Sequence, residues 1–186
     1  QDWLYTPSHY FAEATNGEVF CDPSGEFSLI RKEILHGMPE DVRLKKIASK
    51  AIAMAQSGQY NFKRCLQHGD RGAAKLALAR FAEQGAEMLF LLNRAHAPYY
   101  KWLLRAAERL PILGKETLVL RTLLTDSQIS DENKINLVED FCFNIEKELV
   151  NQSLSPAFGD YLEPYAFAVN DKIKNSEIRN LHIMQD

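Results

Sequence analysis

The residues with the clearest chemical potential follow Pro98. Tyr99, Lys101 and Trp102 come directly after this proline, which cannot continue a helical hydrogen-bond ladder. We therefore expect Lys101 to lie in the first turn of a new helix. A helix start carries partial positive charge and open N–H groups, so a lysine there is electrostatically misplaced unless an anion is bound. The pattern predicts a phosphate site.

The aromatic residues of the same run admit two interpretations. Tyr99, Tyr100 and Trp102 offer flat rings on which a nucleobase can stack, at about 1–3 kcal/mol per base. Alternatively, Tyr100 and Trp102 belong to the core and the Lys101 side chain extends past them to water. The sequence leaves both interpretations open.

The element expected to position this run is a long helix over Arg71 to Ala97. Its apolar residues recur at spacings of four and three, which is typical of a helix with one buried face. They are Ala74, Leu78, Phe81, Gly85, Met88 and Leu92. Gly85 within this stripe admits both close helix packing and ligand approach, and packing is the more common reason for a glycine inside a helix. With helices over Glu40 to Gln67 and Asp131 to Val150, it is expected to form a bundle with Leu78, Phe81, Met88 and Leu92 at its centre.

The rest of the chain also reads as helical. Shorter helices are expected over Ser8 to Ala14, Phe27 to Leu35, Leu118 to Leu124, Tyr161 to Lys174 and Glu177 to Met184, with Ser8, Ser130 and Ser176 as caps. Glu18 to Asp22 is the only plausible extended segment, and a lone strand makes no stable sheet. The prediction is an all-α bundle forming one domain over residues 1–186.

Four basic residues lie on the helix that begins near Glu40. They interleave with apolar positions, as on the outer face of an amphipathic helix. They are Arg43, Lys45, Lys46 and Lys50. We expect them to be solvated, in preference to contacting phosphates.

Composition excludes several classes of function. The formal charge of −3 gives no overall attraction to nucleic acid, and no apolar run approaches the roughly 20 residues of a spanning helix, so no membrane partner is expected. The five histidines show no ligand spacing, and P-loop, GxGxxG and GxSxG motifs are absent from the sequence. We expect a cytoplasmic protein without a metal site of its own.

Three phrases carry a family resemblance: YNFKRCLQHGD, LLNRAHAPYYKW and IRNLHIMQ. From Trp3 to Met184 the chain resembles the helical C-terminal domain, family 4037 of the domains of unknown function, of bacterial nucleotidyltransferase-like proteins. The resemblance implies a longer protein whose N-terminal nucleotidyltransferase-like domain is the partner of this chain. Such domains hold magnesium with an Asp-x-Asp pair, which this sequence lacks. We therefore expect no transferase activity from this chain alone.

The resemblance also implies an accessory role in which the helices form one side of a nucleotide or acceptor site. The residues assigned to that side are Lys101, Tyr99, Trp102, Arg94, Asn93, Tyr60 and Arg64. The alternative is a non-catalytic interaction or dimerisation module, regulatory or antitoxin-like, with a second copy of the chain as partner. An Asp-x-Asp motif in the rest of the parent protein would favour the accessory role, and its absence would favour the interaction module.

Overall fold

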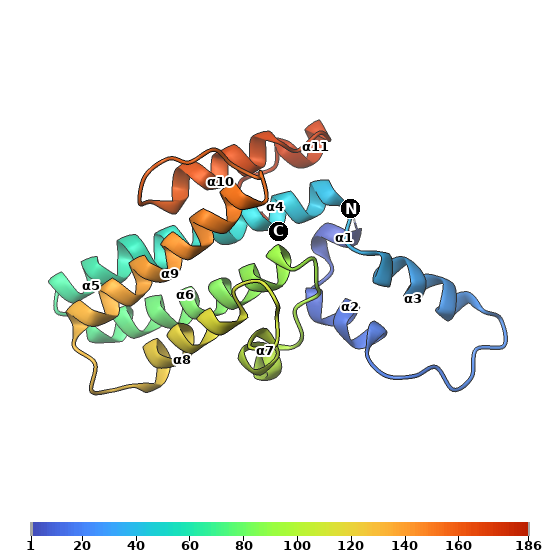
Figure 1. Cartoon of the computed structure of the whole chain (residues 1–186), viewed down its shortest axis with the longest axis horizontal. Helices are drawn as coiled ribbons and strands as arrows, with labels where there is room; N and C mark the ends of the chain where they lie inside the picture. The colour runs from blue at the N-terminus through green and yellow to red at the C-terminus, as the bar shows by residue number, and fades with distance from the viewer. Residues whose placement is uncertain (1, 186) are drawn as a thin grey trace.

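The computed structural model describes residues 2–185, and its regular elements are helices throughout (Figure 1). In order they are α1 (Asp2–Tyr5), α2 (Ser8–Thr15), α3 (Glu26–His36), α4 (Glu40–Met54), the π-helix η1 (Ala55–Phe62), α5 (Lys63–Gln67), α6 (Arg71–Leu92), α7 (Tyr100–Ala107), the 3₁₀-helix η2 (Gly114–Glu116), α8 (Thr117–Thr125), α9 (Asp131–Asn151), α10 (Leu162–Asp171) and α11 (Ser176–Arg179). Residues 18–22 are irregular, and no strand occurs in the described part of the chain. The all-α prediction is confirmed.

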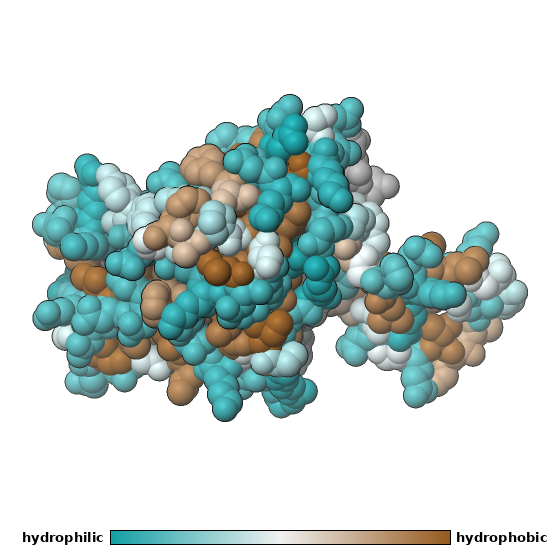
Figure 2. Space-filling view, turned by 45° about the horizontal axis from the view of Figure 1, so that its top comes forward, coloured by the Kyte–Doolittle hydropathy of each residue, from teal (hydrophilic) through white to brown (hydrophobic). Residues whose placement is uncertain are grey.

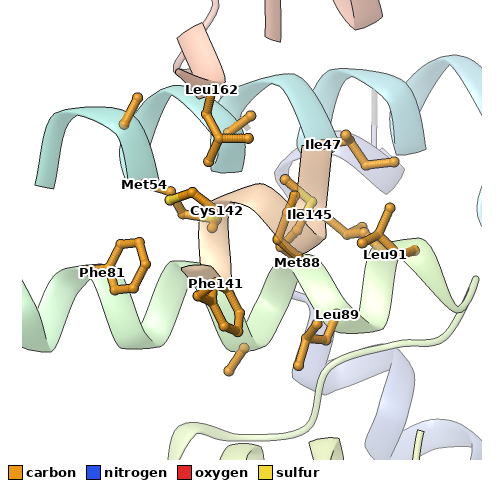
Figure 3. Packing of buried hydrophobic residues seen from close by; sticks show 14 of the residues in the cluster. Ile47, Met54, Phe81, Met88, Leu89, Leu91, Phe141, Cys142, Ile145 and Leu162 are labelled. Atoms are coloured by element: carbon orange, nitrogen blue, oxygen red, sulfur yellow. The ribbon is translucent and has the colours of Figure 1, made fainter. Parts of the chain in front are cut away.

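Helix α6 lies at the centre of the bundle. It contacts α4, η1, α7 and α8, while α10 covers α4 and α9 (Figure 1). Phe81 and Met88 of α6 are fully buried, and Leu78 and Leu92 nearly so. Figure 3 shows the close packing of Phe81 and Met88 with residues of α4 and α9. The predicted core stripe is confirmed, because the 3.6-residue period of a helix places these side chains on one face.

Two glycines let α6 approach its neighbours. A Cβ on Gly85 would lie 2.9 Å from Phe141 Cε1 of α9, so this glycine serves close helix packing, as predicted. A Cβ on Gly58 of η1 would lie 2.7 Å from Phe81 Cε2 and 2.9 Å from a methyl carbon of Val138. The wide turn of the π-helix brings its backbone against these side chains.

Helix α6 ends at Leu92, five residues earlier than predicted. Arg94 adopts a left-handed conformation with φ of 55°. The Ala95 N–H donates to the Phe90 carbonyl at 2.9 Å, and the Arg94 N–H donates to the Leu91 carbonyl at 3.2 Å. These bonds form a Schellman ending, which usually uses glycine. The prediction of a helix to Ala97 is wrong, because the left-handed conformation of Arg94 ends the helix before Pro98 is reached.

The basic residues of α4 are not solvated, which corrects the sequence-based expectation. Arg43, Lys45 and Lys46 are buried, and the side chain of Lys50 is only 14% exposed. Arg43 donates to the Leu91 carbonyl at 3.1 Å, and Lys46 donates to the Leu4 carbonyl at 2.8 Å. These long side chains cross the apolar layer and bind carbonyl oxygens at the ends of other elements.

The C-terminal segment is fastened to α4 by polar contacts. Lys45 Nζ donates to Asn170 Oδ1 at 3.0 Å and to the Leu181 carbonyl at 2.7 Å. Burial lowers the pKa of Lys45. Asp41 accepts hydrogen bonds from the N–H groups of Lys174 and Asn175. This segment therefore adds a second layer over α4.

Several helix ends differ from the prediction. Helix α10 ends at Asp171, before Lys174, and α11 ends at Arg179 rather than near Met184. Asn175 caps α11 in place of Ser176 by accepting from two N–H groups. Ser130 caps α9 as predicted, by accepting from the Asn133 N–H.

The N-terminal helices form an arm beside the bundle. Figure 1 shows α2, α3 and their connection extending away from the other helices, and α2 and α3 contact one another. Figure 2 shows apolar surface on this projecting lobe. The arm contributes large exposed apolar side chains, including Phe20, Leu29, Ile30 and Leu35.

Candidate functional site

An open cleft of about 870 Å³ lies between the arm and α7. Its walls come from α2, α3 and α7, and the chain between α6 and α7 crosses between them. Its polar and aromatic lining includes His9, Tyr10, Arg94, His96, Tyr99, Lys101 and Trp102. We call this site the α7 cleft.

Lys101 lies in the first turn of α7, as the sequence predicts. Tyr99 occupies the N-cap position, and α7 has no side-chain cap hydrogen bond there. Lys101 Nζ lies 5.6 Å from the ring centroid of Trp102 and 6.0 Å from that of Tyr99. A positive charge, open N–H groups and two aromatic rings therefore share one edge of the cleft.

The rings near Lys101 are exposed. Tyr99 is 41% exposed, Tyr100 66% and Trp102 51%. The alternative in which Tyr100 and Trp102 are core residues is wrong. Their rings are available for stacking, because α7 turns its Leu103 and Ala107 to the bundle instead.

The segment 95–99 holds the start of α7 in place. It leaves the Schellman ending of α6, buries Ala97 and reaches the N-cap of α7 at Tyr99. Ser8 does not cap α2 as predicted; its Oγ accepts from the Ala97 N–H at 2.9 Å. This contact joins the start of α2 to the segment that crosses the cleft.

Arg94 reaches the cleft from the end of α6. Its Nη1 donates to Glu40 Oε2 at 2.7 Å. Glu40 also accepts from Arg43 at 2.7 Å and 3.0 Å. The hydrogen bonds of Arg43, and then of Arg94, lower the pKa of Glu40 to about 2. Glu40 thus holds both guanidinium groups, and Arg94 remains largely exposed at the cleft.

Two histidines of the cleft are not evident from the sequence. The His9 ring meets the Tyr99 ring edge-on at 5.3 Å between centroids. The His96 ring lies 5.2 Å from Phe11 and 6.0 Å from Trp3, and its buried Nδ1 has no hydrogen-bond partner in the structure. Burial lowers the pKa of His96, which favours the neutral ring. The AHAPYYKW phrase contains His96, but no local signal marks His9.

Asn93, which was predicted to line the site, instead uses its side chain for hydrogen bonds to main-chain groups. Its Nδ2 donates to the carbonyls of Leu89 and Ile112 at 2.7 Å and 2.9 Å, and its Oδ1 accepts from the Ile112 N–H at 2.9 Å. These hydrogen bonds connect the turn after α7 to the end of α6. Asn93 therefore connects two segments of the chain and does not line the α7 cleft.

Tyr60 and Arg64 are not brought to the α7 cleft. They line a separate surface hollow of about 260 Å³ at η1 and α5. Arg64 Nη1 donates to Tyr60 Oη at 2.5 Å. The predicted site residues thus fall into a cleft group of Arg94, Tyr99, Lys101 and Trp102 and a separate pair of Tyr60 and Arg64, while Asn93 lines neither hollow.

Within residues 2–185, no group of three or more His, Cys, Asp or Glu side chains is arranged to hold a metal ion. Magnesium therefore has no cluster of ligands in the described part of this chain. The helices of that part also include none with the length and apolarity to cross a membrane.

Comparison with known proteins identifies the family. A family model described as "Domain of unknown function (DUF4037)" matches residues 3–103, and the chain belongs to that family. The match spans the arm, α4, α6 and the start of α7, so it includes every polar residue named in the α7 cleft. No curated protein and no solved structure matches the chain.

Proposed function

We propose that this chain is the accessory helical domain of a nucleotidyltransferase-like protein, and that its α7 cleft binds a nucleotide or a phosphorylated acceptor. One observation carries the proposal: exposed Lys101 stands in the first turn of α7 within 6.0 Å of two exposed aromatic rings. A nucleotide has the matching chemistry, with an anionic phosphate beside a flat base.

Each part of the cleft has a role in this proposal. Lys101 and the open N–H groups of α7 neutralise a phosphate, and the base stacks on Trp102 or Tyr99. Arg94 adds a second cation that Glu40 orients. A stacked base contributes about 1–3 kcal/mol, and a charge-assisted hydrogen bond about 1.5–3 kcal/mol.

The chemical step is assigned to the partner domain. Nucleotidyl transfer needs carboxylates that clamp metal ions around the reacting phosphate. This chain has no Asp-x-Asp pair, so the proposed nucleotidyltransferase-like domain supplies magnesium and catalysis. The α7 cleft supplies affinity and position, in the cytoplasm where nucleoside triphosphates are abundant.

The proposal is tested by titrating the chain with ATP in a calorimeter, with and without magnesium. Lys101→Ala is expected to weaken binding about 10- to 100-fold and to leave the melting temperature unchanged or slightly raised, because it removes a charge that opposes the helix dipole. Lys75→Ala is the matched control, since Lys75 is an exposed lysine of α6 outside the cleft.

Two outcomes contradict the proposal. In the first, Lys101→Ala binds ATP as tightly as the unaltered chain. In the second, Lys101→Ala melts much earlier while binding normally, which makes Lys101 a structural residue.

A second candidate function, an interaction or dimerisation module, is favoured by the apolar surface of the arm. Phe20 is 94% exposed, and Leu29, Ile30 and Leu35 are more than half exposed. Monomeric proteins seldom expose such clusters. Sedimentation velocity tests a second copy as the partner: a dimer abolished by Leu29→Glu supports it. A chain that stays monomeric at high concentration contradicts it.

A further inference from the structure

A second pocket lies on elements that the α7 cleft does not use. It has a volume of about 300 Å³ and is formed by the C-terminal half of α9, the loop 152–161 and α10. This volume is at the lower end of the range for small-molecule sites. Its charged and aromatic lining residues are Phe143, Glu146, Lys147, Phe158, Asp160 and Tyr165. We call it the α9 pocket.

Glu146 lines this pocket and is only 3% exposed. Its Oε1 is buried and has no hydrogen-bond partner among residues 2–185. An unpaired buried carboxyl oxygen costs about 1–3 kcal/mol, which a folded protein usually recovers through a partner. Glu146 therefore lines the pocket with a carboxyl group that the described residues leave partly unpaired, and this points to a donor or a cation supplied from outside the chain.

Two further carboxylates increase the negative potential. Burial, followed by the charges of Asp160 and Glu139, raises the pKa of Glu146 to about 7. Gln59 binds Glu139 at 2.7 Å, whereas Asp160 lines the pocket with an exposed side chain. The lining sets the two carboxyl groups of Glu146 and Asp160 against the one ammonium of Lys147, so an excess of negative charge favours a positively charged ligand.

Aromatic rings stand around the same carboxylates. The ring of Phe143 already makes a cation–π contact, because Lys147 Nζ lies 4.0 Å from its centroid. The ring of Phe158 packs edge-on against Tyr165 at 5.3 Å. Tyr165 Oη accepts from the Phe158 N–H at 3.0 Å and donates to the Gly159 carbonyl at 3.2 Å. These bonds fix Phe158, which is about half exposed, at the edge of the pocket.

We propose that the α9 pocket binds a small organic cation, an amine or quaternary ammonium compound, through the carboxylates of Glu146 and Asp160 and the ring of Phe158. Aromatic rings attract ammonium groups through their negative faces, and carboxylates supply the balancing charge. A bare metal ion fits less well, because the described residues bring no three metal-binding side chains together. The proposal is independent of nucleotide binding at the α7 cleft.

The test uses choline as the probe and its neutral isostere, in which carbon replaces the quaternary nitrogen. Both are titrated into the full chain while amide NMR spectra are recorded. Choline is expected to shift the signals of residues 143–165 and to bind at least about tenfold more tightly than the neutral compound, because only choline carries the charge.

Three variants locate the binding. The titrations are run at about pH 8, where Glu146, with its pKa of about 7, is mostly ionised. Glu146→Gln and Asp160→Asn then each remove a negative charge from the pocket, and Phe158→Ala removes a ring; each is expected to weaken choline binding by about tenfold or more. Asp140→Asn is the matched control, because Asp140 is an exposed carboxylate of the same helix outside the pocket. It is expected to bind choline normally.

The proposal is overturned if choline does not bind, if the neutral isostere binds equally well, or if Asp140→Asn weakens binding as much as Asp160→Asn does. Shifts confined to residues outside the α9 pocket overturn it too. Asp160 and Phe158 have exposed side chains, so their variants remain informative even if Glu146→Gln fails to fold.

Discussion

Arg94 and Glu40 form an ion pair, with 2.7 Å between Nη1 and Oε2, that joins the second residue after α6 to the first turn of α4. The same carboxylate holds Arg43, whose side chain is 2% exposed and also binds the Leu91 carbonyl. Glu40 thus connects two arginines to the end of α6. This network fixes the place from which the segment 95–99 starts toward α7.

Glu40→Gln is expected to reduce the free energy of unfolding by about 1–3 kcal/mol at neutral pH, because it leaves buried Arg43 without a carboxylate. Urea denaturation at several pH values measures the loss. The folded-state pKa of Glu40, about 2, lies below its usual value of 4.5. Its contribution is therefore complete above about pH 4.5 and disappears as the pH falls toward 2. A difference between the proteins that persists at pH 2 would point to another cause.

Asn93→Ala is expected to cost about 1–3 kcal/mol, because it removes both hydrogen bonds between Asn93 and Ile112. Thermal melting compares it with Lys101→Ala, which should melt like the unaltered chain. If Asn93→Ala melts normally and instead loses ATP binding, Asn93 belongs to the cleft itself.

Gly58→Ala is expected to destabilise the chain by about 1–3 kcal/mol, because the added methyl group overlaps the Phe81 ring and crowds Val138. Gly72→Ala is the matched control. Its Cβ would meet only Asp70 Oδ1, at 3.4 Å, so the stability should stay equal or rise by up to about 1 kcal/mol. Equal melting temperatures for the two variants would refute the role given to Gly58.

Glu146 is expected to make the chain less stable as the pH rises from about 4.5 to about 7. Its folded-state pKa of about 7 exceeds the usual 4.5, so the folded state binds the proton more tightly in this interval. The loss should be on the order of 3 kcal/mol at most, because each unit of pKa shift corresponds to about 1.4 kcal/mol. Urea denaturation of Glu146→Gln should show a flatter pH profile. Parallel profiles for the two proteins would exclude Glu146 as the titrating group.

The helices and the core were predictable because their signal is local. Leu78, Phe81 and Met88 repeat with the period of a helix, and that period alone places them on one face. Tyr99, Lys101 and Trp102 were predictable as a group for the same reason, since one turn of α7 holds them together.

The remaining features depend on partners that are distant in sequence. Arg43 and Lys45 look solvated until the carbonyls of Leu91 and Leu181 are placed beside them. A left-handed helix end is usually marked in the sequence by glycine, but at the end of α6 this position is Arg94. The side chain of Arg94 binds Glu40, which is distant in sequence. His9 joins the cleft because the neighbouring Ser8 accepts a hydrogen bond from the Ala97 N–H, which brings the start of α2 to the segment 95–99.

The rate at which Lys45 reacts with an amine reagent would report how often the C-terminal segment opens. Its buried ammonium is held by Asn170 and by the carbonyls of Arg179 and Leu181, so a reagent that acylates amines can reach it only after this segment leaves α4. Exposed lysines such as Lys172 react at once. The lag of Lys45 behind Lys172 would therefore measure how often the chain opens at this end, separately from the slower exchange of amides in the core of α6.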